Sequence, residues 1–450
     1  MSSTLKTITV EQHLQRVLRW LPITRTESVS LDEAVDRTTA EEITASLDLP
    51  PWDNAAMDGY AVRVADTVEA TPDQPVTLRV IGSIGAGARA HRQLSSGEAV
   101  AITTGAPVPE TATSVVPIED VVGFDPAQPT AGAKTPEHIQ LTAPPADGKH
   151  IRRRAEDVYA GESVLAAGIR MSAHHVGAVA AAGVAEVPVK ARPKVAVIAT
   201  GEELVDPGSP LAHGQIPDSN SYLVAAQVRA AGGDVVLRTH VGDDPNELRR
   251  VLAETADHSD AVVLTGGASV GAHDVSRLVL APDAPAGYSV DDERGDHRLH
   301  DAAVQFVRVQ MQPGKPQGFG VLDDGRPVWV LPGNPVSALV STVLFVCTGL
   351  AAMQGRVMTT PAWRAVTTAT GWVPPGGRTQ YLPVRSVGPD DELFPAGRSE
   401  GEVISPAHER GSGSHLAARL GLATGLVRIP AAVESVSAGD TVMYRELGGA

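Results

Sequence analysis

The sequence contains very little cysteine. Among its 450 residues there is one, Cys347, within the apolar run ALVSTVLFVCTGL. A single thiol excludes an intrachain disulfide framework and zinc sites built from several thiolates, and it is typical of a protein of a reducing compartment. We interpret this cysteine as buried and unreactive.

A leader segment, long apolar runs and net positive charge are also missing. The N-terminal residues MSSTLKTITVEQHLQRVL show no charged stretch followed by an apolar core, and no run of about 18 apolar residues is apparent. Lys+Arg 37 against Asp+Glu 53 give a net charge of −16, which disfavours a nucleic-acid partner or an anionic membrane surface. We therefore expect a cytoplasmic protein in which an anionic ligand is met by a local basic patch.

What the chain does contain is typical of a soluble protein with several domains. Hydrophobic residues make up 42% and charged residues 20%, and the 44 glycines and 34 prolines imply many turns. Single cores stop growing at about 250–300 residues, so two to four domains are expected.

The first 190 residues mix helical and strand patterns. Residues 9–21 predict an amphipathic helix with Thr9 and Gln12 in a capping box, and Ser30 to Glu33 predicts a second helix start. From about 61 to 122, short alternating stretches cut by Gly and Pro predict an inserted β module. Residues 125–149, rich in Pro, Ala, Gly and Thr, are interpreted as a loop or linker before a further helix over 172–182.

From Lys194 the pattern is that of a doubly wound parallel sheet. Strands alternate with helices of ten to fifteen residues, and the segments are KVAVIATG, 219–231, DVVLRTHV, 245–256 with Asp244 as N-cap, AVVLTGG, and PVWVLPGNPVSALVSTVLFV. Short strands return after Trp363 and predict a last β domain of about 90 residues.

Glycine-rich loops follow three of these strands. They are TGEE from Thr200, TGGASVGAHD from Thr265 to Asp274, and LPGNPVS ending at Ser337. In such sheets ligands bind beyond the carboxyl ends of the strands, so these loops are expected to converge there. Bare backbone at Gly266, Gly267 and Gly271, with Ser269 beside them, suits phosphate or carboxylate, although glycines alone could simply serve a tight turn.

Three carboxylates flank these loops: Glu203, Asp243 and Asp274. Like charges at one crevice call for a cation, and hard oxygen ligands beside phosphate suit Mg²⁺. Asp243 can alternatively belong to a helix start. Lys315, on the turn QPGKP, is an expected anion ligand, and the cluster from Arg152 to Arg154 is either functional or a solvated face.

Together these motifs resemble the molybdopterin molybdenumtransferase family, the MoeA family, which includes the E domain of gephyrin. The resemblance runs from about residue 9 to 447 and is carried by PWDNAAMDGYA, TTGAP, RRRAED, TGEEL, TGGASVGAHD, PGKP and LPGNPVS. It implies that molybdenum from molybdate is placed on the dithiolene of adenylylated molybdopterin, and that AMP leaves with Mg²⁺ assistance.

The resemblance also implies an architecture. An elongated discontinuous domain would cover 1–50 and 148–190, an inserted β module 51–147, a molybdopterin-binding α/β domain 191–360, and a C-terminal β-barrel-like domain 361–450. It further implies a homodimer whose cleft lies between the α/β domain of one chain and the inserted module of the other. Transient docking of a molybdopterin adenylyltransferase is a further expectation.

Site residues are carried over position by position. The implied magnesium ligands are Glu203 and Asp274, and the implied catalytic set adds Asp243, Lys315, Asp58 and Asp157. The implied substrate-binding set is Thr104, Arg152, Gly266, Gly267, Ser269, Gly271, Arg308 and Ser337.

Two features depart from the family pattern. Relatives often carry Lys or Arg just before PGKP, where this chain has Gln312, with Arg308 four residues earlier. The stretch between Asp274 and Lys315 is also longer than expected and is interpreted as an added surface loop.

Two other functions compete with this interpretation. A molybdopterin adenylyltransferase shares the TGGxSxGxxD domain but lacks the flanking motifs. A gephyrin-like scaffold would keep the motifs with a vestigial cleft, and AMP release that depends on molybdate would distinguish the enzyme from it.

Overall fold

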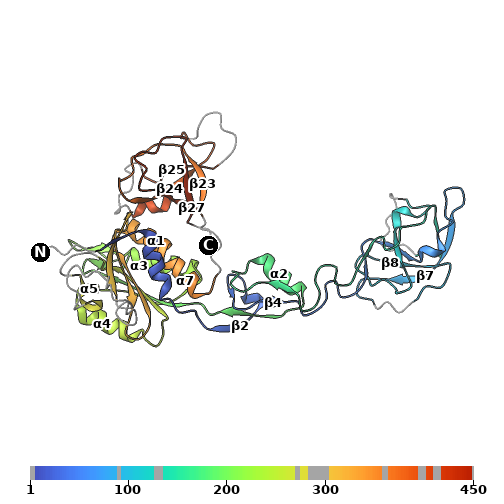
Figure 1. Ribbon diagram of the computed structural model, residues 1–450, viewed down its shortest axis with the longest axis horizontal. Helices are drawn as coiled ribbons and strands as arrows, with labels where there is room; N and C mark the ends of the chain where they lie inside the picture. The colour runs from blue at the N-terminus through green and yellow to red at the C-terminus, as the bar shows by residue number, and fades with distance from the viewer. Residues whose placement is uncertain are drawn as a thin grey trace, which may run out of the picture.

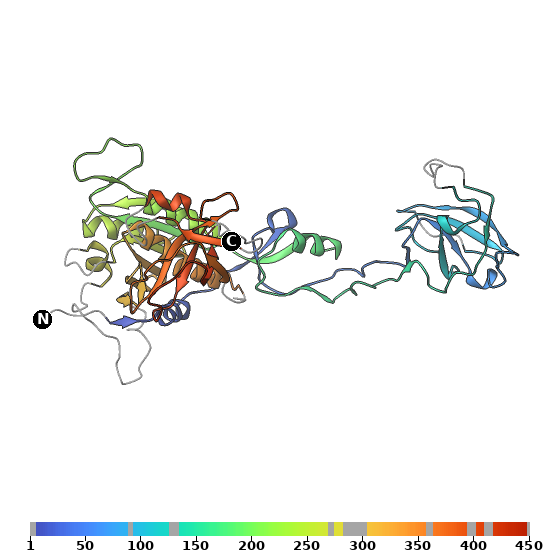
Figure 2. The same ribbon diagram turned by 90° about the horizontal axis from the view of Figure 1, so that it is seen from above.

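The structure is a computed structural model, and it describes residues 6–88, 93–125, 135–268, 274–281, 304–356, 363–393, 402–408 and 417–447. The molecule is elongated (Figures 1 and 2). An α/β body lies at one end beside a C-terminal barrel, a narrow arm follows, and a β module forms the far end. The body, arm, barrel and far module are described in turn.

The body is built on a seven-stranded sheet. Its order is β1 (Thr7–Ile8), β19 (Gln305–Val309), β21 (Pro316–Val321), β22 (Pro327–Pro332), β18 (Ala261–Gly266), β14 (Lys194–Thr200) and β17 (Asp234–Val241). All neighbours pair in parallel except β21, which is antiparallel to both β19 and β22. The predicted doubly wound parallel sheet is thus confirmed except for β21, whose antiparallel pairing was not predicted.

Local signals explain the helices of the body. The capping box of Thr9 and Gln12 opens α1 (Val10–Arg19), as predicted. Asp244 accepts a hydrogen bond from the Asn246 amide at the start of α4 (Pro245–Glu254), which has proline in its first turn. The helix α3 (Asn220–Ala230) ends before Gly232, whose φ of 85° suits glycine. Apolar faces of α1, α3 and the long helix after β22 pack on one side of the sheet.

That long helix corrects one expectation. The segment Pro335–Met353 combines α6 (Pro335–Ser341), a π-helical turn (Thr342–Val346) and α7 (Cys347–Met353). Its 19 residues have a mean hydropathy of 2.1, so by length and composition it could span a membrane, contrary to the sequence prediction. However, 78% of the segment is buried inside the protein, as in the core helix of a soluble domain. Cys347 is only partly buried, contrary to the expectation of a buried side chain. Desolvation still raises the pKa of its thiol to about 11, which agrees with an unreactive cysteine.

The arm carries a three-stranded sheet of β2 (Thr26–Ser30), β13 (Glu186–Lys190) and β3 (Thr38–Thr39), together with α2 (Ala173–Ala181). The second helix predicted at Ser30 is wrong, because only a 3₁₀ turn, Leu31–Glu33, forms there. The Ser30 hydroxyl bonds the Glu33 side chain at 3.1 Å instead of capping a backbone amide. Two long crossings lead from the arm to the far module, and β11 (Ile151–Arg152) pairs there with β5 (Asn54–Ala55).

The far module is a five-stranded sheet. Its order is β10 (His138–Leu141), β7 (Val76–Ile84), β8 (Glu98–Ile102), β6 (Gly59–Val62) and β9 (Ser114–Pro117). The interpretation of 125–149 as loop is wrong for β10, whose Ile139 and Leu141 point into the core. This strand forms because it pairs with β7, some sixty residues earlier, although the sequence around it is rich in turn residues.

The C-terminal strands close into a barrel. The ring runs β24 (Thr379–Val387), β25 (Val403–Pro406), β23 (Arg364–Thr368), β27 (Thr441–Glu446) and β26 (Gly425–Ile429), and β26 pairs again with β24. A short strand, β20 (Met311–Gln312), leaves the body sheet and pairs with β24. The barrel is therefore attached to the body beside the predicted Lys315 turn.

Candidate functional site

The predicted loops share one edge of the body sheet, here called the rim. Strand ends meet there in register: Ala199 lies beside Thr265, and Gly266 beside Pro332. Because β21 runs antiparallel, its first residues lie at the same edge, as does the end of β19. The order along the rim places acidic loops after β17 and β14 and basic residues beside β21 and β19.

Glycines form a close-packed floor in the middle of the rim. A Cβ on Gly266, at φ 119°, would lie 2.3 Å from the Thr200 carbonyl oxygen, and one on Gly267 would lie 1.8 Å from the Ser276 hydroxyl. A Cβ on Gly333 would lie 3.3 Å from the Gly266 Cα. The glycines therefore allow close packing of three loops as well as exposing backbone. Ser269 and Gly271 lie outside the described residues.

The three predicted acids occupy separate loops of the rim. The Glu203 carboxylate folds over Gly201, 2.5 Å from where a Cβ would be. Asp274 is the N-cap of α5 (Val275–Leu280), and its Oδ1 would lie 2.8 Å from a Cβ on Gly267. Asp243 is exposed. Among the described residues, no three His, Cys, Asp or Glu side chains form a metal-binding group.

Asp243 and the next residue, Asp244, have different roles in the structure. The helix start that competed for Asp243 is served by Asp244, which caps α4 through the Asn246 amide at 2.9 Å. Asp243 is thus left pointing to solvent at the end of β17. A purely structural role as helix cap does not apply to it.

The basic side of the rim includes a residue that the sequence did not reveal. Lys315 is exposed, and Arg308 pairs across the strands with Pro316 beside it. Gln312 accepts a hydrogen bond of 2.9 Å from Arg378 Nη1, at the start of the barrel. In the described part of the chain, no salt bridge is made by Lys315, Arg308 or Arg378. Arg378 therefore supplies a cation next to the neutral Gln312.

A polar group at the start of α3 also lies on the rim and was missed. Asp218 is fully buried and accepts a 3.0 Å bond from the Ser221 amide as well as one from the Ser221 hydroxyl. Asn220 donates through Nδ2 to the Gly333 carbonyl at 2.6 Å. The available signal was the run PDSNS at the start of the helix predicted over 219–231. Ser337, in the first turn of α6, is buried at 4% exposure behind this rim.

Asp58 and Thr104 come together at the opposite end of the molecule. The Asp58 Oδ1 accepts hydrogen bonds from the Thr104 amide at 2.6 Å and from its hydroxyl at 2.9 Å, and both residues are exposed on the far module. Figure 2 shows the arm between this module and the body. A single chain therefore does not unite the two predicted halves of the site.

Two of the three arginines in the cluster from Arg152 to Arg154 form salt bridges. Arg153 pairs with Asp53 at 2.7 Å, and Arg154 pairs with Asp48. Arg152 is exposed on β11 without a salt bridge in the described ranges, and Asp157 is exposed nearby, its amide bonded to the Leu49 carbonyl at 3.0 Å. The functional hypothesis for the cluster narrows to Arg152 and Asp157.

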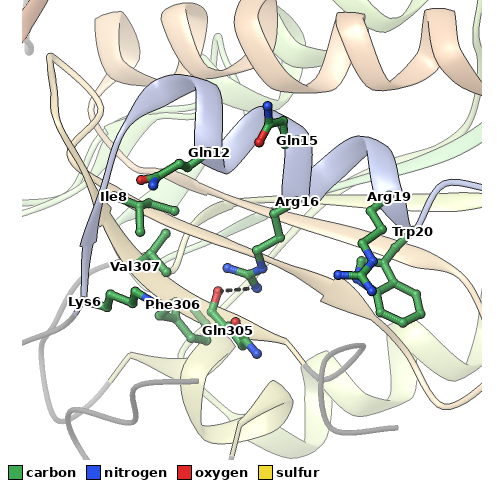
Figure 3. A pocket seen from close by; sticks show the side chains of 10 residues that line it. All are labelled: Lys6, Ile8, Gln12, Gln15, Arg16, Arg19, Trp20, Gln305, Phe306 and Val307. Carbon is green, nitrogen blue, oxygen red and sulfur yellow. Dashed lines mark hydrogen bonds between the residues drawn. The ribbon is translucent and has the colours of Figure 1, made fainter. Parts of the chain in front are cut away.

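A cavity of about 460 Å³ lies elsewhere, between α1 and the outer strands β1 and β19 (Figure 3). Arg16 spans it and donates through Nη2 to the Gln305 carbonyl at 3.4 Å and to that of Phe319. This arginine fastens α1 to the sheet. The cavity contains none of the predicted site residues and is not the rim.

Comparison with known proteins agrees with this arrangement. Residues 8–183 match the family described as MoeA N-terminal region (domain I and II), and residues 196–352 match a probable molybdopterin binding domain. Molybdopterin molybdenumtransferase 2 of Mycobacterium tuberculosis is 38% identical over 97% of this chain and 99% of its own length. The molybdopterin molybdenumtransferase of Haemophilus influenzae is 34% identical over 78% of each chain.

Solved structures extend the likeness to the fold. A molybdopterin biosynthesis MoeA protein from Pyrococcus horikoshii has a TM-score of 0.75 at 30% identity, over 98% of this chain and 99% of that one. Both the α/β body and the flanking parts are therefore shared, not the body alone. The chain belongs to the molybdopterin molybdenumtransferase family.

Proposed function

We propose that this chain inserts molybdenum from molybdate into the dithiolene of adenylylated molybdopterin and releases AMP. The observation that carries the proposal is the division of the rim. One floor of glycine backbone separates the exposed carboxylates of Glu203 and Asp243 from two cations, the exposed Lys315 and the half-buried Arg308. A substrate with a phosphate end and an oxyanion partner needs both kinds of group on one surface.

The carboxylate side suits Mg²⁺. Glu203 and Asp274 each follow one of two adjacent strands, β14 and β18, and each carboxylate lies against a glycine of its own strand end. Mg²⁺ commonly binds one or two carboxylates together with substrate phosphates, so two protein ligands are sufficient. When bound, the ion would neutralise charge on the leaving phosphate. Asp243 would hold or orient water beside it.

The cationic side suits the oxyanion. Arg308 lies on β19, Lys315 directly precedes β21 and Arg378 directly precedes β24, close to where the barrel joins the body. Their charges stand out in a chain with a net charge of −16 and would attract molybdate to this end of the rim. Asn220 and the buried Asp218–Ser221 pair hold the loop between the two sides.

The complete site requires a second chain. Asp58, Thr104, Arg152 and Asp157 lie on the far module and its crossings, remote from the rim of their own chain. A homodimer in which each far module meets the partner's rim would bring both sets to one ligand. Exposure of all four side chains supports this arrangement. Docking of an adenylyltransferase at the same cleft would deliver the adenylylated substrate.

Two alternatives differ in what they would use. An adenylyltransferase would need only the body, whereas the family likeness covers the arm and far module as well. A scaffold would not need the division of charge along the rim.

The experiment is release of AMP from adenylylated molybdopterin by the purified protein, with and without molybdate and Mg²⁺. We expect release that depends on both ions. A protein that binds the substrate but releases no AMP under these conditions would contradict the proposal, and the scaffold would then be favoured.

A further inference from the structure

Two neighbouring chain crossings connect the arm to the body. On the first, Thr24 donates its amide to the Met353 carbonyl at 2.8 Å and its hydroxyl to the Ala191 carbonyl at 2.8 Å. On the second, the Ala191 amide donates to the Arg25 carbonyl at 2.8 Å. Two adjacent strands make a hinge line, about which the arm could rotate unless another contact lies off that line.

Such a contact is made by Arg356. Its Nε donates to the Thr38 hydroxyl at 3.1 Å, and Thr38 is fully buried on β3 of the arm. In the arm sheet Lys190 lies between Thr26 and Thr38. Neighbouring strands are about 4.8 Å apart, so Thr38 lies one strand away from the crossings. A bond at this distance from the hinge line resists rotation.

The end of α7 is shaped to hold Arg356. Gly355, at φ 64°, donates its amide to the Ala352 carbonyl at 2.9 Å, and Arg356 donates its amide to the Ala351 carbonyl at 3.1 Å. This pair of bonds is the Schellman motif, which ends a helix and fixes the direction of the chain after it. The backbone of Arg356 is thereby anchored to the body.

The other side of the guanidinium is fastened to the body too. Nη2 donates to the Ala231 carbonyl at 3.0 Å and to the Gln354 Oε1 at 2.9 Å. A Cβ on Gly232 would lie 2.7 Å from Nη2, so glycine at the end of α3 leaves room for it. Burial, and then the neighbouring Arg170, lower the pKa of Arg356 to about 10, and the group remains charged at neutral pH.

We propose that Arg356 is a latch that fixes the angle between body and arm, and thereby places the far module against the partner's rim. The first part stands on the contacts above. The second part rests on the two-subunit site proposed for molybdenum insertion. Arg356 touches no substrate in this proposal and acts as a positioning residue.

A simpler role would be to satisfy the last carbonyls of α3. That role uses Ala231 and Gln354 but not Thr38, which belongs to the arm. Thr38→Val keeps the shape of the side chain and removes only the bond across the joint, whereas Thr38→Ser keeps the hydroxyl. Arg356→Gln removes the reach of the guanidinium. Arg25→Gln is the matched control, because the exposed Arg25 side chain lies near the crossings and pairs with Glu27 without reaching the body.

The measurement is a distance distribution between spin labels on the arm and the body. Exposed Ala178 on α2 and exposed Ala253 on α4 are replaced by cysteine in the full chain, and labelled chains are mixed with excess unlabelled chains. Without substrate, Thr38→Val and Arg356→Gln should shift the mean distance or make the distribution at least twice as wide. Thr38→Ser and Arg25→Gln should leave it unchanged.

Activity tests the second part. Thr38→Val should lower the rate of AMP release at saturating substrate about tenfold with little change in KM, and Thr38→Ser should restore it. Unchanged distances in both Thr38→Val and Arg356→Gln would refute the latch. Altered distances with a wild-type rate would refute the placement of the far module. If the wild type releases no AMP, the proposed function fails while the distances still decide the latch.

Discussion

The rim and the far module carry site residues in different ways. On the rim, the acidic side chains follow strands of one sheet, and close-packed glycines and buried partners such as Asp218 hold the loops. On the far module, Asp58 and Thr104 bond to each other on an exposed surface. The comparison shows that the rim loops are held by the body of the chain, whereas Asp58 and Thr104 are positioned by each other at the opposite end of the molecule.

The largest effect is expected for Asp274→Asn on the rim. Asparagine is also a good N-cap, so α5 should form normally, while loss of the charge removes a proposed magnesium ligand. We expect AMP release to fall about a hundredfold, a range seen when charge stabilisation in an active site is removed. Thermal melting should match the wild type. A wild-type rate at ordinary Mg²⁺ concentration would exclude Asp274 as a ligand.

A heterodimer tests whether the two regions meet across subunits. Asp58→Asn and Asp274→Asn homodimers carry one defect in both clefts, whereas their heterodimer has one cleft with both defects and one with neither. Purified, differently tagged heterodimers should therefore recover up to half of the wild-type rate of AMP release. If heterodimers form and are no more active than either parent, the site lies within one chain.

A smaller effect is expected for the charge near Gln312, which Arg378 supplies in this chain and a lysine at position 312 would supply in a variant. Because Arg378 already contacts Gln312, Arg378→Gln should weaken molybdate binding about tenfold, the effect of one charge-assisted hydrogen bond. Gln312→Lys should change the affinity less and add salt dependence. Arg419→Gln, on the exposed surface of the barrel, is the control. Equal affinity of Arg378→Gln and wild type by calorimetry would remove this residue from the site.

The last prediction concerns the stability of the body and leaves the site unchanged. Burial, and then Arg16, lower the pKa of His13 from 6.5 to about 3. Between these values the unfolded chain binds a proton that the folded chain does not, so stability falls with decreasing pH by about 1.4 kcal/mol per pH unit in this window. His13→Phe, packed against Phe345, should flatten that slope in urea titrations, whereas exposed His213→Asn should not. An unchanged slope in His13→Phe would contradict a neutral buried imidazole.

Features that depend on residues close together in the sequence were predicted correctly, and features that depend on distant residues were not. The start of α1 and the cap of α4 depend on residues within one turn, so the sequence predicted both correctly. The strand β10 depends on β7 far along the chain and was mistaken for loop. The spacing of Ser30 and Glu33 predicted a helix start, but these two side chains bond to each other and only a 3₁₀ turn forms.

The same limit applies to the site. The parallel sheet was predictable, and with it the meeting of the loops that carry Glu203, Gly266 and Ser337. The place of Lys315 at the same edge was not, because it depends on the antiparallel strand β21. Arg378 was not, because it reaches Gln312 from the barrel, 66 positions along the chain. The separation of Asp58 from the rim also depends on the length of the arm, which no local pattern records.

The buried apolar helix Pro335–Met353 has a consequence for synthesis of the protein. Strands β14, β17 and β18 and the helices between them precede it in the chain, and β22 comes directly before it. When this segment leaves the ribosome, the sheet that covers it is therefore already made. We expect chains in which β14 fails to fold to expose a hydrophobic segment that chaperones or the membrane-insertion machinery would recognise.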